Sequence, residues 1–238
     1  MNLLKDLAII IPVAPKENAW RSLLKDLKDL PSETEILLVG PNKPPNFERF
    51  LRRLSHSEKQ VDWIDSPLGR ARQLNLGAQH TQKKFLWFLH ADSRLHSSSF
   101  PALEKALITD PHALYYLNLR FLDDGPPLTK INAVGVWIRS HWLSLPFGDQ
   151  GFCITKTLFE LLGQFPEDAP YGEDHLFVWS ARRAGIPVRS VSAKIYTSSR
   201  KYRKNGWAKT TIRHGIYTIK QAFPEWMKLL TSQRGAAK

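Results

Sequence analysis

Short apolar runs alternate with longer amphipathic stretches along this chain of 238 residues. Runs that are apolar at successive positions are typical of strands covered on both faces, whereas apolar residues spaced three and four apart indicate helices. The pattern predicts strands at 7–13, 35–40, 61–65, 84–89, 113–121, 151–155 and 186–192. It predicts helices at 18–30, 46–56, 69–80, 128–145, 158–163 and 173–185, with a further helix in the basic C-terminal segment.

Strands that alternate with helices of ten to fifteen residues indicate βαβ units and a mostly parallel sheet with helices on both faces. We therefore expect a single α/β domain with a Rossmann-like first half. The segment 113–121 alternates between apolar and polar residues, which predicts a strand with one solvated face. Gly163 and Gly185 stand where helices are expected to end. There is no internal repeat and no linker that would divide the chain.

Composition is ordinary for a folded globular protein, with 42% hydrophobic and 24% charged residues. The single cysteine, Cys153, excludes an intramolecular disulfide and fits a reducing compartment. The apolar run near the N-terminus is interrupted by a proline, and we interpret it as a core strand. No apolar stretch approaches the ~20 residues that span a bilayer. We expect a cytoplasmic protein, with a peripheral location at the inner face of the membrane as the alternative.

The charge is unusual, at +12. Residues 200–213 contain six basic side chains and no acid. Such an excess favours polyanions, phosphorylated small molecules or an anionic lipid surface, although a solvated helix start is the simpler explanation. Tyr202 and Trp207 interleave with the basic residues, as in some nucleic-acid binders. Because no nucleic-acid motif is visible, we expect no nucleic-acid partner.

The strand 84–89 delivers His90 and Asp92 at its carboxyl end. Ligands of open α/β sheets bind outside the carboxyl ends of the strands, so both side chains are expected in that crevice. A carboxylate there suits Mg²⁺ or Mn²⁺, with phosphate oxygens of a substrate completing the coordination. Alternatively, Asp92 caps a helix that begins near residue 97, and His90 is a packed structural histidine.

Two further segments carry candidate chemistry. Arg70 and Arg72 follow Gly69 at a helix start, where guanidinium groups and the helix N-terminus both favour phosphate. Glu173 and Asp174 begin another helix, and only one of two adjacent carboxylates can face a crevice. In each case the plain alternative remains open: solvated arginines for the first segment, and an acidic first turn favoured by the helix dipole for the second.

A set of short motifs in this order resembles inverting nucleotide-sugar glycosyltransferases of the GT-A fold, in particular a bacterial branch of selenodomain-associated glycosyltransferase-like proteins. The motifs are IIIPV at 9–13, GRARQLNLGA at 69–78, FLHADSRL at 88–95, PFGDQGFCI at 146–154, GQFPE at 163–167, GEDHLF at 172–177 and TSSRKYRKNGW at 197–207. They span nearly the whole chain. The resemblance implies a nucleotide-binding half at 1–95, an acceptor half at 96–195 and a basic C-terminal segment and helix at 196–238.

The resemblance also implies roles for individual residues. Asp92 stands where relatives carry a DxD metal motif, and His90 replaces the first acid and is a candidate second ligand of Mn²⁺ or Mg²⁺. Asp174 is expected to be the catalytic base, with Glu173 beside it. Donor and diphosphate binding is assigned to Arg70, Arg72, Asn75, Asp92, Arg200 and Arg203. Asp149 and Gln150, in a loop flanked by glycines, are expected on the acceptor side.

The implied activity is metal-assisted transfer of a sugar from a nucleotide-diphospho-sugar to an unknown acceptor hydroxyl with inversion. A lipid-linked acceptor would fit a basic C-terminal segment that rests on an anionic membrane. One motif departs from the family: after strand 35–40, relatives carry an acidic segment that contacts the nucleotide, and here the stretch is VGPNKPP. The alternative is therefore a catalytically silent GT-A-like module that binds an anionic ligand or partner.

Overall fold

The computed structural model describes residues 2–54 and 60–236. Its strands are β1 (Leu7–Pro12), β2 (Glu35–Gly40), β3 (Gln60–Asp65), β4 (Phe85–Phe88), β5 (Arg94–Leu95), β6 (Leu114–Phe121), β7 (Phe152–Thr155) and β8 (Val188–Thr197). Its α-helices are α1 (Trp20–Asp26), α2 (Phe47–Arg53), α3 (Arg70–His80), α4 (Ser99–Thr109), α5 (Thr129–Trp142), α6 (Lys156–Leu161), α7 (Glu173–Arg183), α8 (Arg200–Asn205) and α9 (Trp207–Ala236). Three 3₁₀ turns are η1 (Leu3–Asp6), η2 (Leu27–Asp29) and η3 (Gly148–Gln150).

The described strands form one sheet in the order β3-β2-β1-β4-β7-β6-β8-β5. Strands β1 to β4 are parallel, β7 is antiparallel to both β4 and β6, and β8 is parallel to β6. The short β5 pairs antiparallel with β8. Six of the eight described strands therefore end at the same edge of the sheet, where ligands of open α/β folds bind.

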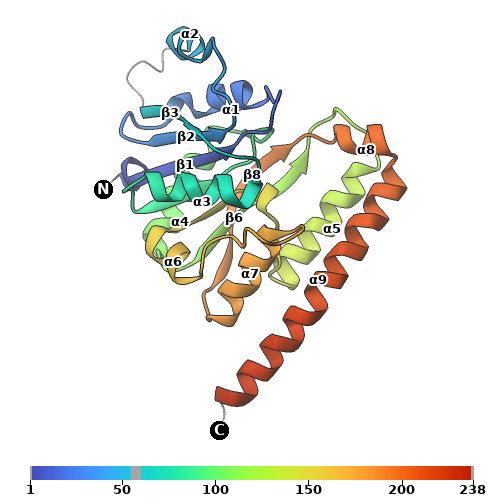
Figure 1. The fold of residues 1–238 in the computed structure, drawn as a ribbon. Helices are drawn as coiled ribbons and strands as arrows, with labels where there is room; N and C mark the ends of the chain where they lie inside the picture. Colours follow the sequence, from blue (N-terminus) through green and yellow to red (C-terminus); the bar gives the residue numbers. More distant parts are fainter. Residues whose placement is uncertain (1, 55–59, 237–238) are drawn as a thin grey trace.

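Helices cover both faces of the sheet (Figure 1). Along β1, Ile9 and Ile11 pack with α1, α2 and α4, whereas Ala8 and Ile10 pack with α3, α6 and α7. This alternation is the period of two of a strand, and it explains why β1 is apolar at every position. The fold is a single α/β domain with a mostly parallel sheet, as the sequence predicts.

The main predicted strands and helices are present, with shifted ends. The predicted helix 18–30 ends at Asp26 and continues as η2, and the predicted strand 186–192 extends to Thr197. The helix expected at 46–56 ends at Arg53, and residues 55–59 lie outside the described part of the chain. Gly163 and Gly185 follow α6 and α7 with φ of 85° and 71°, which confirms the predicted helix ends.

One strand differs from its prediction. The alternation at 113–121 predicted a solvated face, but Leu114 to Leu117 are buried on both sides. The reason is position, because β6 lies inside the sheet between β7 and β8 and is covered by helices. In the neighbouring strand β7, Cys153 is fully buried, and burial raises the pKa of its thiol.

The C-terminal helix α9 runs beside α5 at one side of the domain (Figure 1). Two hydrogen bonds join these helices, since Trp207 Nε1 donates to Asn132 Oδ1 at 3.0 Å and Asn132 Nδ2 donates to Thr211 Oγ1 at 3.0 Å. Within the described residues, none of the helices combines the length and the apolar character that crossing a membrane requires.

Candidate functional site

Four segments that are far apart in the sequence meet at the carboxyl edge of the sheet. They are the start of α3 at Arg70, the end of β4 at His90, the turn η3 before β7, and the start of α7 at Asp174. Contacts and charge interactions between these segments place Arg70, His90, Asp149 and Asp174 in one cluster. The chain thus brings together residues that the sequence assigned to the donor, the metal, the acceptor and the base.

Asp174 is buried and held by three neighbours. Its Oδ2 accepts a hydrogen bond from the backbone N–H of Gly148 at 2.6 Å, and its Oδ1 accepts one from the N–H of His175 at 2.9 Å. Arg70 Nη2 lies 3.7 Å from Oδ1. Burial alone would raise the pKa of Asp174, but the charge of Arg70 and the Gly148 N–H outweigh it and lower the pKa. The carboxylate is therefore ionised at neutral pH.

The neighbouring acid, Glu173, turns to Arg70. Arg70 Nε donates to Glu173 Oε1, and Arg70 Nη2 also pairs with Asp174, so both acids of α7 contact one guanidinium from α3. Burial lowers the pKa of Arg70, but the charges of Asp174 and Glu173 reverse the effect, and the net shift is upward. The arginine side chain remains 41% exposed. It can therefore still meet a phosphate from the crevice.

His90 is a neutral imidazole in this cluster. Burial, followed by the positive charge of Arg70, lowers its pKa to about 4, although Asp149 and Asp174 oppose the shift. Asp149, on η3, has an Oδ1 that is buried without a hydrogen-bond partner in the structure. A buried acceptor without a partner is costly. The expected contact of Asp149 with an acceptor remains a prediction.

Gln150, also on η3, is fully buried and fully engaged. Its Oε1 accepts from Ser140 Oγ at 2.8 Å and from the N–H of Phe147 at 3.1 Å, and its Nε2 donates to the carbonyl of Leu117 at 3.1 Å. These bonds fix the η3 turn against α5 and β6. The geometry gives Gln150 a bracing function, and its expected contact with an acceptor remains a prediction.

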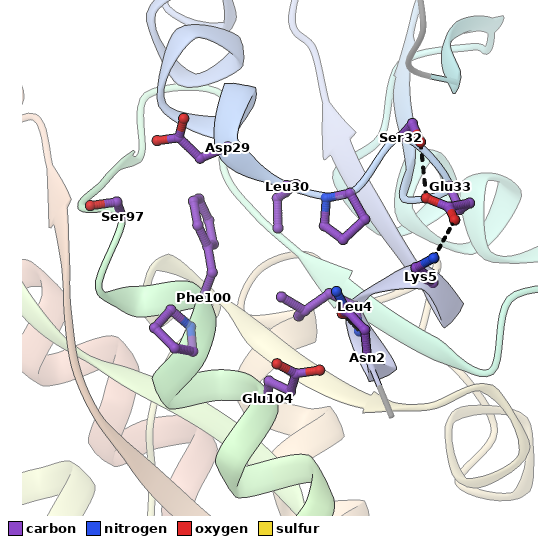
Figure 2. Close-up of a pocket in the computed structure, with 12 residues that line it drawn as sticks. Asn2, Leu4, Lys5, Asp29, Leu30, Ser32, Glu33, Ser97, Phe100 and Glu104 are labelled. Carbon is purple, nitrogen blue, oxygen red and sulfur yellow. Dashed lines mark hydrogen bonds and ion pairs between the residues drawn. The ribbon is translucent and has the colours of Figure 1, made fainter.

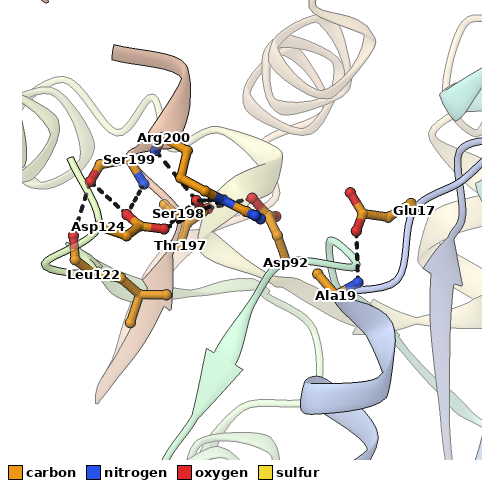
Figure 3. Close-up of polar contacts among 9 residues, drawn as sticks. All are labelled: Glu17, Ala19, Asp92, Leu122, Asp124, Thr197, Ser198, Ser199 and Arg200. Atoms are coloured by element: carbon orange, nitrogen blue, oxygen red, sulfur yellow. Dashed lines mark hydrogen bonds and ion pairs between the residues drawn. The ribbon is translucent and has the colours of Figure 1, made fainter. Parts of the chain in front are cut away.

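Asp92 lies two residues beyond His90, between the segment that follows β8 and the loop that carries Glu17 (Figure 3). It accepts a long hydrogen bond, 3.5 Å, from Thr197 Oγ1. Burial raises the pKa of Asp92, the nearby charge of Glu17 adds to the rise, and Lys201 opposes it. The described residues contain no group of three or more His, Cys, Asp or Glu side chains that could hold a metal ion. Metal binding by Asp92 and His90 remains a prediction.

The remaining predicted donor residues have other contacts. Arg72 pairs with Glu167 at 3.2 Å, and Asn75 is buried and bonds Phe165, donating to its carbonyl at 2.8 Å and accepting from its N–H at 3.0 Å. These contacts tie α3 to the loop before α7.

On the other side of the site, Arg200 donates to Ser198 Oγ at 2.9 Å and lies 3.6 Å from Asp124 (Figure 3). Arg203 is exposed on α8. Donor binding by Arg72, Asn75, Arg200 and Arg203 remains a prediction.

A hollow of about 620 Å³ lies at the carboxyl ends of β2 and β3, on the same edge of the sheet as the site. Its lining residues are Pro41, Asn42, Lys43, Asp65, Ser66 and Pro67. The VGPNKPP stretch that lacks an acid therefore faces Asp65 from the next strand. Asp65 Oδ1 accepts from Trp63 Nε1 at 3.3 Å and weakly from the N–H of Lys43 at 3.4 Å. The hollow thus contains a carboxylate from β3, although the VGPNKPP stretch itself contributes none.

A second hollow, of about 550 Å³, lies between η1, η2 and the start of α4, before the amino ends of β1 and β2. Figure 2 shows its polar rim, with Lys5 and Glu33 paired at 2.6 Å and Ser32 donating to Glu33 at 2.9 Å. The hollow contains none of the predicted site residues. The described chemistry therefore concentrates at the opposite edge of the sheet.

Sequence reasoning missed several residues of the cluster. Gly148 lies within the motif PFGDQGFCI, but nothing in the sequence indicated that its backbone N–H bonds to Asp174. Lys201 was within the noted basic run, and its charge reaches both His90 and Asp92. No sequence pattern indicated Arg139. Its guanidinium lies over the ring of Phe147, 3.4 Å from the centroid, and interacts with the charges of Asp149 and Asp174.

Comparison with solved structures identifies similar chains. S. aureus TarS matches with a TM-score of 0.61 and 17% identity, covering 81% of this chain and 36% of TarS. TarS 1-349 in complex with UDP-GlcNAc gives 0.62 and 16%, covering 81% and 58%. The mannosyltransferase PcManGT from Pyrobaculum calidifontis, in complex with GDP-Man and Mn²⁺, gives 0.66 and 16%, covering 96% and 68%. The chain thus spans about a third to two thirds of these relatives, and at these identities the likeness shows the fold, which is GT-A.

No curated protein matches the chain in a sequence search. The family model described as "Glycosyl transferase family 2" matches residues 8–159, from β1 into α6. This match covers more than half of the chain and includes β4 with His90 and Asp92, the turn η3 and the start of α3. The chain therefore belongs to glycosyl transferase family 2.

Proposed function

We propose that the protein transfers a sugar from a nucleotide-diphospho-sugar to an acceptor hydroxyl with inversion at the anomeric carbon. The observation that carries the proposal is the state of Asp174, an ionised and buried carboxylate that Gly148 and Arg70 hold at the carboxyl edge of the sheet. The same edge carries Asp92 and the hollow at Asp65. A base, a diphosphate site and a nucleotide site are three of the parts that this reaction requires.

In the proposed reaction, Asp174 accepts the proton of the acceptor hydroxyl. The oxygen of that hydroxyl bonds to the anomeric carbon while the bond from the carbon to the donor's diphosphate breaks on the opposite face. One base opposite the leaving group is sufficient for inversion. The lowered pKa keeps Asp174 ionised, and the hydroxyl becomes acidic as its oxygen forms the new bond. Arg70 and the N–H of Gly148 keep the carboxylate oriented.

The departing diphosphate carries negative charge that the site must stabilise. Arg70 is partly exposed, and Lys201 interacts with both His90 and Asp92, which supports these two cations as the groups that neutralise it. Asp92 fits a divalent cation that arrives with the donor, because it is a partly buried carboxylate with a raised pKa and one long hydrogen bond. Bound there, Mn²⁺ or Mg²⁺ would offset the charge of the leaving group. Neutral His90 is the candidate second ligand.

We assign the nucleoside of the donor to the hollow between the ends of β2 and β3. Asp65 there replaces the acid that is missing from VGPNKPP, since a carboxylate accepts hydrogen bonds from ribose hydroxyls or base N–H groups. The division into a donor half at 1–95 and an acceptor half at 96–195, the selenodomain-associated branch, and a lipid-linked acceptor remain parts of this proposal. The absent acid also favours the second candidate, a catalytically silent module that binds an anionic ligand.

Thermal melting with UDP, GDP, CDP, ADP and dTDP, each with and without Mn²⁺, tests the proposal. A ligand at a hundred times its dissociation constant adds about 2.7 kcal/mol, which raises the melting temperature measurably. We expect a metal-dependent shift with one nucleotide, lost in Asp92→Ala and reduced in Asp65→Asn. No shift with any of the five would contradict the donor site and favour the silent module.

Asp174→Asn separates binding from catalysis in the same experiment. This variant should keep the nucleotide shift but lose about 10²- to 10⁴-fold in transfer rate, the usual contribution of a general base. Asp168→Asn, an exposed acid on the loop before α7, is the matched control and should retain both. An Asp174→Asn variant with the normal rate would remove Asp174 as the base.

A further inference from the structure

One side of α9 is an exposed apolar stripe. Its members recur at helical spacing of three and four residues: Ile212, Ile216, Ile219, Phe223 and Trp226. Exposed fractions reach 70% for Ile219 and 62% for Phe223. The opposite side of α9 faces the domain, where Thr210 and Glu225 are buried. This amphipathic helix therefore presents its apolar side to the outside, the reverse of an ordinary surface helix.

The helix α5 presents a second stripe beside the first. Ile131, Val134, Ile138 and Trp142 are exposed at spacing of three and four residues, with Trp142 at 74%. Asn132 joins this helix to the first turn of α9 through its bonds with Trp207 and Thr211. We name these nine stripe residues the α5–α9 face. Large apolar side chains exposed on two adjacent helices mark an interaction site.

Basic residues border the α5–α9 face. Lys209, Arg213 and Lys220 lie along one flank of the α9 stripe and are exposed, and the basic helix α8 precedes them. The α5 sequence contains no acid, and the one acid of α9, Glu225, is buried and paired with Arg183. The surface is therefore apolar at its centre and positively charged along the α9 flank, which forms its basic rim.

The charge decides between the possible occupants. A second copy of the chain would bring two basic rims together, and each copy already has a net charge of +12. An anionic lipid surface satisfies both parts of the face, because apolar side chains enter the boundary of the acyl chains while lysine and arginine reach the headgroups. Trp142 and Trp226 are the side chains that favour the membrane interface.

We propose that the α5–α9 face rests on the surface of an anionic bilayer, as a contact that lies on the membrane and does not cross it. This inference goes beyond the proposed function and does not depend on it. It has a bearing on the site, because α5 bonds the η3 turn and α9 bonds the residue next to Asp174. Ser140 of α5 bonds Gln150 at 2.8 Å, and Gln221 of α9 bonds His175 at 2.8 Å.

Co-sedimentation with lipid vesicles tests the proposal. The wild-type chain should sediment with phosphatidylcholine vesicles that contain about a third phosphatidylglycerol, and far less with pure phosphatidylcholine, because surface charge attracts the basic rim. Binding should weaken as salt is raised towards ~1 M. A triple variant, Lys209→Gln with Arg213→Gln and Lys220→Gln, should lose roughly a hundredfold in affinity, at about a factor of five for each charge.

The double variant Ile216→Glu with Ile219→Glu tests the apolar stripe. Both side chains are exposed, so the fold should persist, which the melting temperature checks. Binding to anionic vesicles should fall at least about tenfold, because a charged group is expensive in the apolar boundary. Ile108→Glu, at an equally exposed position of α4, is the matched control and should bind normally.

Three results would overturn the proposal: no sedimentation of the wild type, equal sedimentation with neutral vesicles, or a wild-type dimer that the double variant converts to monomer. The last result would make the face a contact between copies, and light scattering after gel filtration detects it. The double variant should keep its nucleotide melting shift. A failed donor site and a failed membrane contact are therefore separate outcomes.

Discussion

Asp174 is charged inside the protein because groups from three segments surround it. Arg70 comes from α3, the Gly148 N–H from η3, and the His175 N–H from the first turn of α7. Its neighbour His90 shows the opposite effect, since burial and Arg70 keep the imidazole neutral. The site therefore holds an ionised carboxylate near a neutral imidazole, and the charge of Arg70 contributes to both states.

The pKa of His90 predicts a pH dependence of stability. Its folded-state pKa of about 4 lies below the ordinary histidine pKa of 6.5. Between these values the unfolded chain binds a proton that the folded chain does not, so this contribution is complete above about pH 6.5 and is lost as the pH falls towards about 4. The slope is at most about 1.4 kcal/mol per pH unit. His90→Gln should flatten the curve in this window.

Urea unfolding at a series of pH values between about 4 and 7.5 measures this effect. The exposed His112 supplies the control, since His112→Gln should leave the wild-type slope unchanged. Identical slopes for the wild type and His90→Gln would show that His90 binds its proton equally well in both states.

Among the elements, the η3 turn connects the site to three others. It precedes β7, is fixed by Gln150 to α5 and β6, and donates the Gly148 N–H to α7. Because Gly148 has no side chain, the backbone of η3 can approach Asp174 closely. A Cβ at residue 148 would lie 2.9 Å from Asp174 Oδ2 and 3.1 Å from its Cβ.

Gly148→Ala should therefore displace Asp174 and slow transfer. A shift of about 1 Å at a catalytic group is enough for a loss of roughly 10²-fold in rate. Initial transfer rates, with a sugar donor that carries the nucleotide identified by the melting panel, measure the effect. Gly135→Ala on α5 is the control, since a Cβ there meets nothing within 4 Å, and it should keep the wild-type rate. An unchanged rate for Gly148→Ala would mean that the turn gives way without moving the base.

Periodicity predicted most elements because their apolar spacing reflects local backbone geometry. It could not predict the burial of β6, which depends on the strands that pair on each side. The motifs identified Asp92, Arg70 and Asp174, which are adjacent to strand and helix ends. Lys201 and Arg139 were not assigned to the site, because they reach it only after distant segments pack together.

The helix α9 is attached to the domain at several points along its length. Asn132 of α5 bonds Thr211 in the first turn of α9. Further along α9, Gln221 bonds His175, and Glu225 Oε2 accepts from Arg183 Nη1. Glu225 is only 6% exposed, and Lys228 also pairs with it at 2.7 Å. These contacts link the apolar outer face to α7, the helix that carries Asp174.

Glu225→Gln should destabilise the domain by about 1–3 kcal/mol, because Arg183 loses its charged partner in a partly buried position. The free energy of unfolding in urea measures the change. Glu160→Gln removes a long ion pair, 3.8 Å, between Lys156 and the exposed Glu160 side chain, and should cost less than about 0.5 kcal/mol. Equal losses in the two variants would indicate that burial adds nothing to the attachment of α9.

The burial of Cys153 has a practical consequence. It is the one cysteine of the chain, it is 0% exposed, and its thiol pKa is raised by burial, so little reactive thiolate forms at neutral pH. A cysteine introduced at the surface would therefore react alone with maleimide dyes or spin labels. Ile219→Cys on α9 would place a label within the α5–α9 face, and Ile108→Cys on α4 would place one outside it. Each label would be the only modification of the protein.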